Sequence, residues 1–172
     1  VLTLSWADFD SHALQPNMHP VRMTELNAAI SRFFEVLDPA WLSRVTLMTF
    51  SEFGRTSWAN GGLGTDHGSA APHLVIGQNV KGGFYGQRPT IGGLGRWDRM
   101  AHHVDFRSYY ASIIDGWLGG GSNAVLGGNY ENLGLFRREA GVNADGSVSP
   151  GPAVVTPPSR FVPVVPFRLV DT

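Results

Sequence analysis

The segment Arg44–Gly68, RVTLMTFSEFGRTSWANGGLGTDHG, carries the clearest structural signal in this sequence. Its first part, Arg44–Phe50, is nearly continuous in apolar and β-forming residues, which is typical of a strand covered on both faces. Its second part, Ser51–Gly68, collects acids, a base and an imidazole between glycines, although only 16% of the chain is charged. A loop that only has to be solvated needs no histidine. We therefore interpret Ser51–Gly68 as the ligand-bearing edge of a metal site.

Two further strands and two helices are predicted around this segment. Val1–Trp6 and Leu74–Ile76 are short β-rich runs. Apolar residues at helical spacing predict one helix with Thr24 as its N-cap and Pro39 as its stop, and a second helix over Val104–Leu118. Strands separated by helices favour an α/β fold with a parallel sheet and helices on its faces.

The length and composition fit one domain followed by a short extension. A chain of 172 residues with 42% apolar content can bury a core. From about residue 135 onward, turn residues and prolines dominate, so we predict a domain over residues 1–134 and an extension over residues 135–172 that forms an edge strand or a tail. Because the sequence opens directly on an apolar run, we expect it to be the C-terminal part of a longer protein.

The charge balance and the residue types exclude several classes of partner. The net charge is −1, with no basic excess to bind nucleic acid. No run of 18 apolar residues is present, so no membrane span is expected. The chain has no cysteine, which rules out disulfides, thiolate ligands and a cysteine nucleophile within it.

Candidate ligands gather where the predicted strands end. Asp10 and His12 are two residues apart, so in an extended segment their side chains point the same way; Asp8 shares this parity and competes with Asp10. Glu52 follows the next strand. Ligands of doubly wound sheets lie beyond the carboxyl ends of the strands, which is where these residues are expected.

A further pair of candidates lies in the glycine-rich part of the segment. Asp66 and His67 are adjacent, and adjacent side chains diverge on a strand. A tight loop, which the flanking Gly64 and Gly68 permit, would turn them together. Trp58 lies between the clusters and either lines a pocket or packs; the same holds for Asn60.

Mixed carboxylate and imidazole ligands suit zinc, manganese or a comparable divalent ion. The predicted ligands are Asp10, His12, Glu52, Asp66 and His67. Five ligands exceed what one tetrahedral site needs, so two ions are conceivable, and paired ions would clamp the oxygens of a displacement at phosphorus or sulfur. Arg55 would neutralise an anionic substrate. Each piece also has a plainer interpretation, since the aspartate–histidine pairs can be turn features and Glu52 and Arg55 can form an ion pair.

Several motifs occur together in one order along the chain. They are Phe9–His12, Ser51–Thr56, Asn60, Gly64–Gly68, Val80–Gly86, Asp105–Arg107 and Trp117–Gly119. This arrangement resembles the DUF1501 family over residues 1–130. The family looks like a branch of the alkaline phosphatase and sulfatase superfamily. The resemblance implies a three-layer α/β/α sandwich with a mostly parallel sheet, whose N-terminal part lies upstream of this chain.

The resemblance also implies a site for one or two divalent ions, which can be zinc, manganese, magnesium or calcium. Asp10 and His12 would bind the first ion together with His67 as the downstream histidine. Glu52 stands at the superfamily's strand-end acid, and Asp66 would be a ligand or would orient one. The superfamily usually has a histidine where this chain has Phe53, next to Glu52.

The function implied is metal-dependent hydrolysis of a small phosphate or sulfate ester by a periplasmic or secreted protein. The attacking hydroxyl would belong to the upstream segment, with Arg55 and Glu52 as catalytic residues. The alternative is a catalytically inactive, metal-stabilised binding or scaffold protein of the same fold, which Phe53 favours. A third interpretation is a surface loop without a metal.

Overall fold

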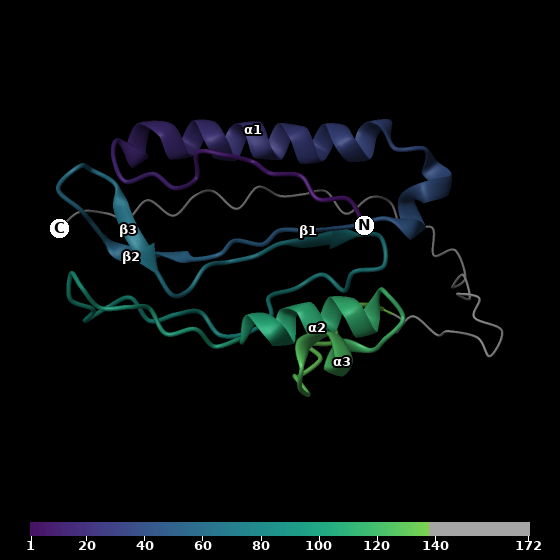
Figure 1. Cartoon of the computed structure of the whole chain (residues 1–172). Coiled ribbons are helices and arrows are strands. Elements are labelled where there is room, and N and C mark those ends of the chain that lie inside the picture. Colours follow the sequence, from purple (N-terminus) through teal and green to yellow (C-terminus); the bar gives the residue numbers. More distant parts are fainter. Residues whose placement is uncertain (138–172) are drawn as a thin grey trace.

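The computed structural model describes residues 1–137, which mix helices with short strands (Figure 1). The elements in chain order are α1 (Gln15–Val36), the 3-10 helix η1 (Pro39–Arg44), β1 (Thr46–Met48), β2 (Gly54–Ala59), β3 (Thr65–Gly68), β4 (Val75–Gly77), α2 (Phe106–Gly116) and α3 (Ser122–Leu126). None of these helices combines the length and the apolar character that crossing a bilayer requires. Most of the predicted extension, residues 138–172, lies outside the described residues.

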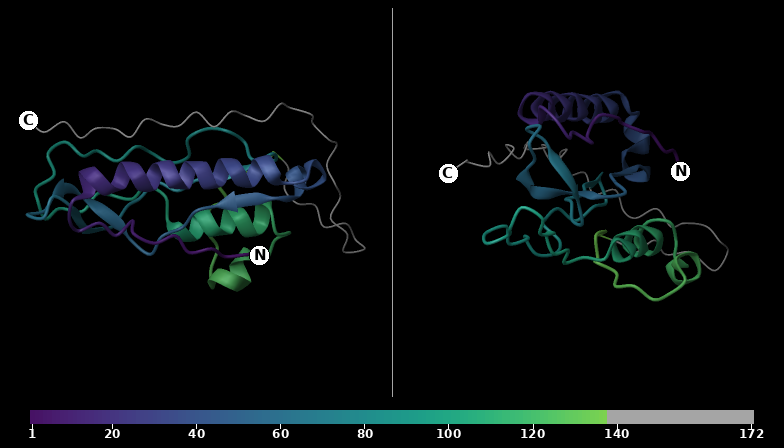
Figure 2. Two further views of the ribbon diagram at one scale, coloured as in Figure 1. Left: turned by 90° about the horizontal axis from the view of Figure 1, so that it is seen from above. Right: turned by 60° about the vertical axis from the view of Figure 1, so that its left-hand side comes forward.

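The helices lie on opposite sides of the strands. Figures 1 and 2 show α1 on one side, the strands in the middle, and α2 with α3 on the other side. β1 pairs with β4, and β2 pairs with β3; both of these two-stranded sheets are antiparallel. Antiparallel pairing suits the short turn between β2 and β3, because a parallel pair needs a longer crossover; β1 and β4 are joined through this hairpin. The larger parallel sheet stays a prediction.

The predicted strand at the N-terminus is wrong. Residues 1–11 form no regular element, and Val1, Leu2 and Leu4 are 109%, 96% and 91% exposed. β propensity alone cannot hold a strand, because the backbone donors and acceptors need a partner. Within residues 1–137, no segment pairs with Val1–Trp6. The first pairing is an isolated antiparallel bridge between Ala13 and Leu63.

The predicted first helix is confirmed, but its start is wrong. α1 begins at Gln15 and has a proline in its first turn, where a missing N–H costs no hydrogen bond. Thr24 lies inside the helix, where its hydroxyl donates to the Pro20 carbonyl at 2.8 Å. The helix ends at Val36, and Pro39 opens η1. The apolar spacing identified the helix. The spaced apolar residues begin only after Thr24, so they do not reveal the proline-containing first turn.

The strands predicted over Arg44–Phe50 and Leu74–Ile76 are confirmed in β1 and β4, and the helix over Val104–Leu118 is confirmed in α2. β1 is shorter than its apolar run, and Phe50 beyond it is 57% exposed. The positions of these elements were therefore readable from the sequence, whereas the lengths of the strands were not.

The core lies between β1, β4 and α2. Ile113, Leu135 and Phe136 are buried, and Met48 and Val75 are among the side chains packed against them. The Lys81 N–H donates to the Leu135 carbonyl at 2.7 Å. The packed region therefore extends past the boundary predicted after residue 134.

Asp105 caps α2, and its loss should destabilise the fold. Its carboxylate accepts from the backbone N–H of Arg107 at 2.8 Å and from the guanidinium of Arg107 at 2.6 Å. Hydrogen bonding from Arg107 lowers the pKa of Asp105 from 3.8 to about 2. We expect Asp105→Ala to lower the free energy of unfolding by about 1 kcal/mol at pH 7, and Asp105→Asn to retain most of the cap.

The charge of Asp105 also predicts a pH dependence. Because its pKa is lower in the folded state, its contribution is present above pH 3.8 and is lost as the pH falls towards 2. Urea unfolding of the wild type and of Asp105→Asn at pH 7 and at low pH measures this. The stability difference between them should shrink at low pH. A difference that stays constant would contradict the assignment.

Candidate metal centre

The N-terminal segment reaches the candidate site through hydrogen bonds to the β2–β3 turn. The N–H of Leu14 donates to the carbonyl of Gly62 at 3.0 Å, and the N–H of Thr65 donates to the carbonyl of Ser11 at 3.3 Å. The bridge between Ala13 and Leu63 lies between these two bonds. These contacts hold the segment that carries Asp10 and His12 against the start of β3.

The β2–β3 hairpin contains an irregularity next to the site. Arg55 pairs with His67, whereas Ala59 already pairs with Thr65, so β2 has extra residues in between. The hydroxyl of Thr56 accepts the N–H of Asp66 at 3.1 Å and donates to the carbonyl of Trp58 at 3.1 Å, replacing a backbone partner. Bulges of this kind redirect side chains. Asp66 and His67 therefore lie on a strand and not in the predicted tight loop.

Three ligand atoms from the two segments converge. Nε2 of His12 lies 3.0 Å from Nε2 of His67 and 3.0 Å from Oδ1 of Asp10. Nε2 of His67 is also 3.0 Å from that same oxygen. The three side chains are about half exposed, at 50% for Asp10 and 48% for each histidine. This group therefore faces solvent.

Arg55 holds the carboxylate of this group. Its Nη1 donates to Oδ1 of Asp10, its Nε donates to the hydroxyl of Thr65 at 3.1 Å, and its Nη2 donates to the Thr65 carbonyl. Burial opposes ionisation of Asp10, but hydrogen bonds from Arg55 and His67 and the neighbouring positive charges outweigh it and lower its pKa. Asp10 is therefore an anion at neutral pH. The predicted contact of Arg55 with a substrate anion stays a prediction.

Asp66 contacts the other side of His12. Its Oδ1 lies 3.2 Å from Nδ1 of His12 and accepts from Nδ2 of Asn60 at 2.9 Å. The hydrogen bond from Asn60, followed by the one from His12, lowers the pKa of Asp66. His12 therefore lies between two carboxylates, one at each ring nitrogen.

Glu52 and Asp8 lie outside the converging group. Among residues 1–137, the group whose ligand atoms converge contains Asp10, His12 and His67. Asp8 pairs with Arg22 of α1 at 2.8 Å, which settles its competition with Asp10. Glu52 is exposed. Its neighbour Phe53 stacks on the ring of His67, with centroids 3.7 Å apart and an interplanar angle of 16°.

Sequence reasoning missed the polar residues that support the site. Thr56 and Thr65 bond the hairpin to Arg55 and Asp66, and the Thr65 hydroxyl also donates to Gln15 at 2.8 Å. The pair Asn60-Gly61 is a strong hairpin-turn signal, which could have identified the β2–β3 hairpin.

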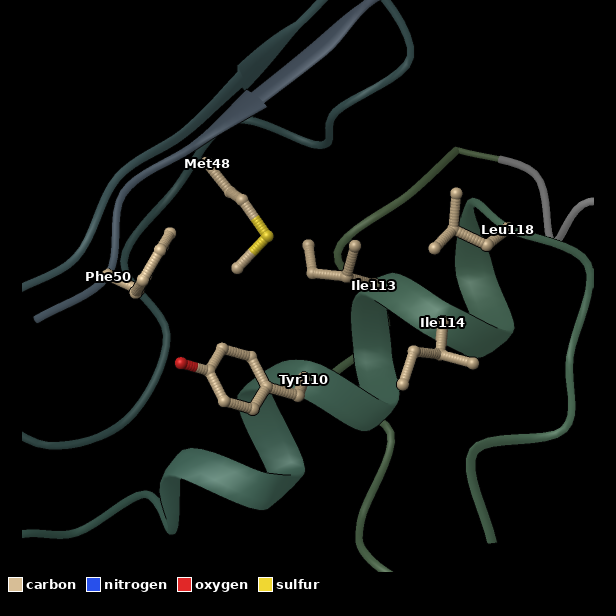
Figure 3. Close-up of a pocket in the computed structure, with 6 residues that line it drawn as sticks. All are labelled: Met48, Phe50, Tyr110, Ile113, Ile114 and Leu118. Carbon is tan, nitrogen blue, oxygen red and sulfur yellow. The ribbon is translucent and has the colours of Figure 1, made fainter. Parts of the chain in front are cut away.

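An apolar groove lies elsewhere in the described part of the chain. It lies between β1 and α2 and is shown in Figure 3, and its lining residues are Met48, Phe50, Tyr110, Ile113, Ile114 and Leu118. Its lining has no carboxylate, imidazole or cation. It is therefore chemically unsuited to an anionic ester and is not the candidate site.

The donor set fits a divalent cation. A carboxylate oxygen and an unprotonated imidazole nitrogen are both acceptors, so at 3.0 Å they repel unless a proton or a cation lies between them. Two imidazoles and one carboxylate are the ligands that zinc and manganese accept. Asp10, His12 and His67 would hold such an ion.

Together, the fold and this cluster define a mixed helix–strand protein with a carboxylate–imidazole centre beside a hairpin. Residues 1–106 match the family described as "Protein of unknown function (DUF1501)". This is more than half of the 172 residues, so the chain belongs to the DUF1501 family. The match covers all residues of the cluster and ends at the start of α2. Neither a curated protein nor a solved structure matches the chain.

Proposed function

We propose that this protein is a metal-dependent hydrolase of phosphate or sulfate esters with an alkaline phosphatase-like α/β/α fold, acting in the periplasm or outside the cell. The observation that supports this most directly is the convergence of Asp10, His12 and His67 on one point. Five ligands were predicted, and three converge, so one ion is the simpler proposal. A second ion would require Glu52, which lies outside the group.

The residues have separate roles in this proposal. When bound, a divalent ion supplies Lewis acidity towards an ester oxygen. Arg55 keeps the Asp10 carboxylate in place and neutralises part of its charge. The half-exposed cluster leaves one side open to a small anionic ester.

One observation favours the second candidate function, a metal-stabilised scaffold without turnover. Phe53 occupies the position where the superfamily has a histidine, and its ring covers one face of His67. A ligand is thereby replaced by a packing contact. Such a site would bind an ion and stabilise the β2–β3 region without activating a substrate.

An activity assay separates the two candidates. The chain, expressed with whatever sequence precedes Val1 in its natural context, is loaded with zinc or manganese and given an aryl phosphate and an aryl sulfate. For a hydrolase, we expect turnover of one ester that falls to background when a chelator is added. Bound metal without turnover of either ester would support the scaffold. A protein that binds neither metal would contradict both candidates.

A further inference from the structure

A chain of polar contacts leads from the turn after β2 to the back of the His12 ring. Nδ2 of Asn60 donates to Oδ1 of Asp66, and Nδ1 of His12 lies 3.2 Å from the same oxygen. An ionised carboxylate only accepts hydrogen bonds. The His12–Asp66 bond therefore requires a proton on Nδ1 of His12.

The proton on Nδ1 decides what His12 offers to the cluster. A neutral imidazole carries one proton, so a protonated Nδ1 leaves Nε2 with a free lone pair. Nε2 is the atom that lies 3.0 Å from Asp10 and 3.0 Å from His67. With the proton on Nε2, the lone pair on Nδ1 would face the Asp66 carboxylate and repel it. A lone pair on Nε2 instead accepts from the Nε2–H of His67, which also lies 3.0 Å from Oδ1 of Asp10, so in the metal-free protein one proton on His67 serves both acceptors.

Asn60 fixes the position of Asp66 relative to the backbone. Its Oδ1 accepts the N–H groups of Gly62 at 2.9 Å and Gly64 at 3.1 Å, while its Nδ2 is used by Asp66. The same turn hydrogen-bonds the segment that carries His12. Asp66 and the segment that carries His12 are therefore both hydrogen-bonded to the β2–β3 turn.

We propose that Asn60 and Asp66 form a positioning pair, which holds His12 in the Nδ1–H tautomer and directs its Nε2 lone pair into the cluster. Asp66 then acts on a ligand and is not a ligand itself. Such hydrogen-bonded carboxylates behind a metal-binding histidine fix its tautomer and orientation. The role of this pair in metal binding depends on the proposed metal site. The tautomer of His12 does not, because it can be observed in the metal-free protein.

The tautomer can be observed directly. Long-range proton–nitrogen NMR of the metal-free, histidine-labelled protein, at a pH where His12 is neutral, shows which ring nitrogen carries the proton. We expect the wild type to have the Nδ1–H form, and Asp66→Ala to shift His12 towards the Nε2–H form. Asn60→Ala should shift it part of the way. Glu131→Ala removes an exposed carboxylate outside the converging group and should leave the tautomer unchanged.

Zinc titration by calorimetry gives a second measurement. We expect Asp66→Ala and Asn60→Ala to weaken zinc binding by about 10–100-fold, while Glu131→Ala leaves it unchanged. A wild-type His12 in the Nε2–H form would overturn the proposal even if no variant folds, and so would an unchanged tautomer in Asp66→Ala. If the tautomer shifts as expected but the wild type binds neither zinc nor manganese, the positioning pair stands and the proposed metal site fails.

Discussion

Replacing His12 or His67 by alanine is expected to weaken zinc or manganese binding by more than about 100-fold, beyond the range typical for residues that only orient a ligand. Three atoms converge, with mutual distances of 3.0 Å, so each substitution leaves two. Two exposed ligands compete poorly with water for a divalent ion. Calorimetric titration and metal analysis of the purified protein measure the loss.

His103→Ala is the matched control for this experiment. It removes an exposed imidazole that lies outside the converging group. We expect it to bind metal like the wild type, and circular dichroism should show that all three variants remain folded. If His12→Ala and His67→Ala both keep the wild-type metal content, the converging atoms are a hydrogen-bonded cluster. Both the hydrolase and the metal-stabilised scaffold would then be rejected.

Local patterns in the sequence were enough to find α1, β1, β4 and α2. The apolar runs that became β1 and β4 and the helical spacing of α2 are carried by the residues themselves. Val1–Trp6 has the same β-rich character, yet it forms no strand among residues 1–137, because pairing depends on a neighbour that local sequence does not specify. The β2–β3 hairpin was missed because β2 is polar and irregular and so lacks the apolar pattern of a strand. The Asn60-Gly61 turn was its one clear signal in the sequence.

The candidate site was predicted in part. The two-residue spacing of Asp10 and His12 correctly placed both side chains on one side, because that spacing holds in any extended segment. His67 joined them through hairpin pairing with Arg55, which the sequence did not reveal. Glu52 failed to join because it lies between β1 and β2, where no pairing fixes its direction. The spacing argument therefore brought Asp10 and His12 together, whereas the tight loop predicted for Asp66 and His67 is a strand, and the common sheet edge predicted for Glu52 stays a prediction.

Gly64→Ala is expected to move the segment that carries Asp10 and His12 away from His67 on β3. A Cβ at Gly64 would overlap the backbone of His12 and Ala13, whereas a Cβ at Gly61, in the same turn, would meet nothing within 4 Å. Neither glycine has a positive φ, so alanine is conformationally allowed at both positions, and the difference between them is steric. Inserting a methyl group into such a tight contact typically costs about 1–3 kcal/mol.

Two measurements on Gly64→Ala and its control Gly61→Ala test this. Urea unfolding should show a loss of about 1–3 kcal/mol for Gly64→Ala and little change for Gly61→Ala. Zinc titration should show weaker binding for Gly64→Ala alone, because the clash pushes the segment that carries Asp10 and His12 away from His67. If Gly64→Ala matches Gly61→Ala in both stability and zinc affinity, the N-terminal segment does not dock on the turn. The cluster would then lack the contact that assembles it.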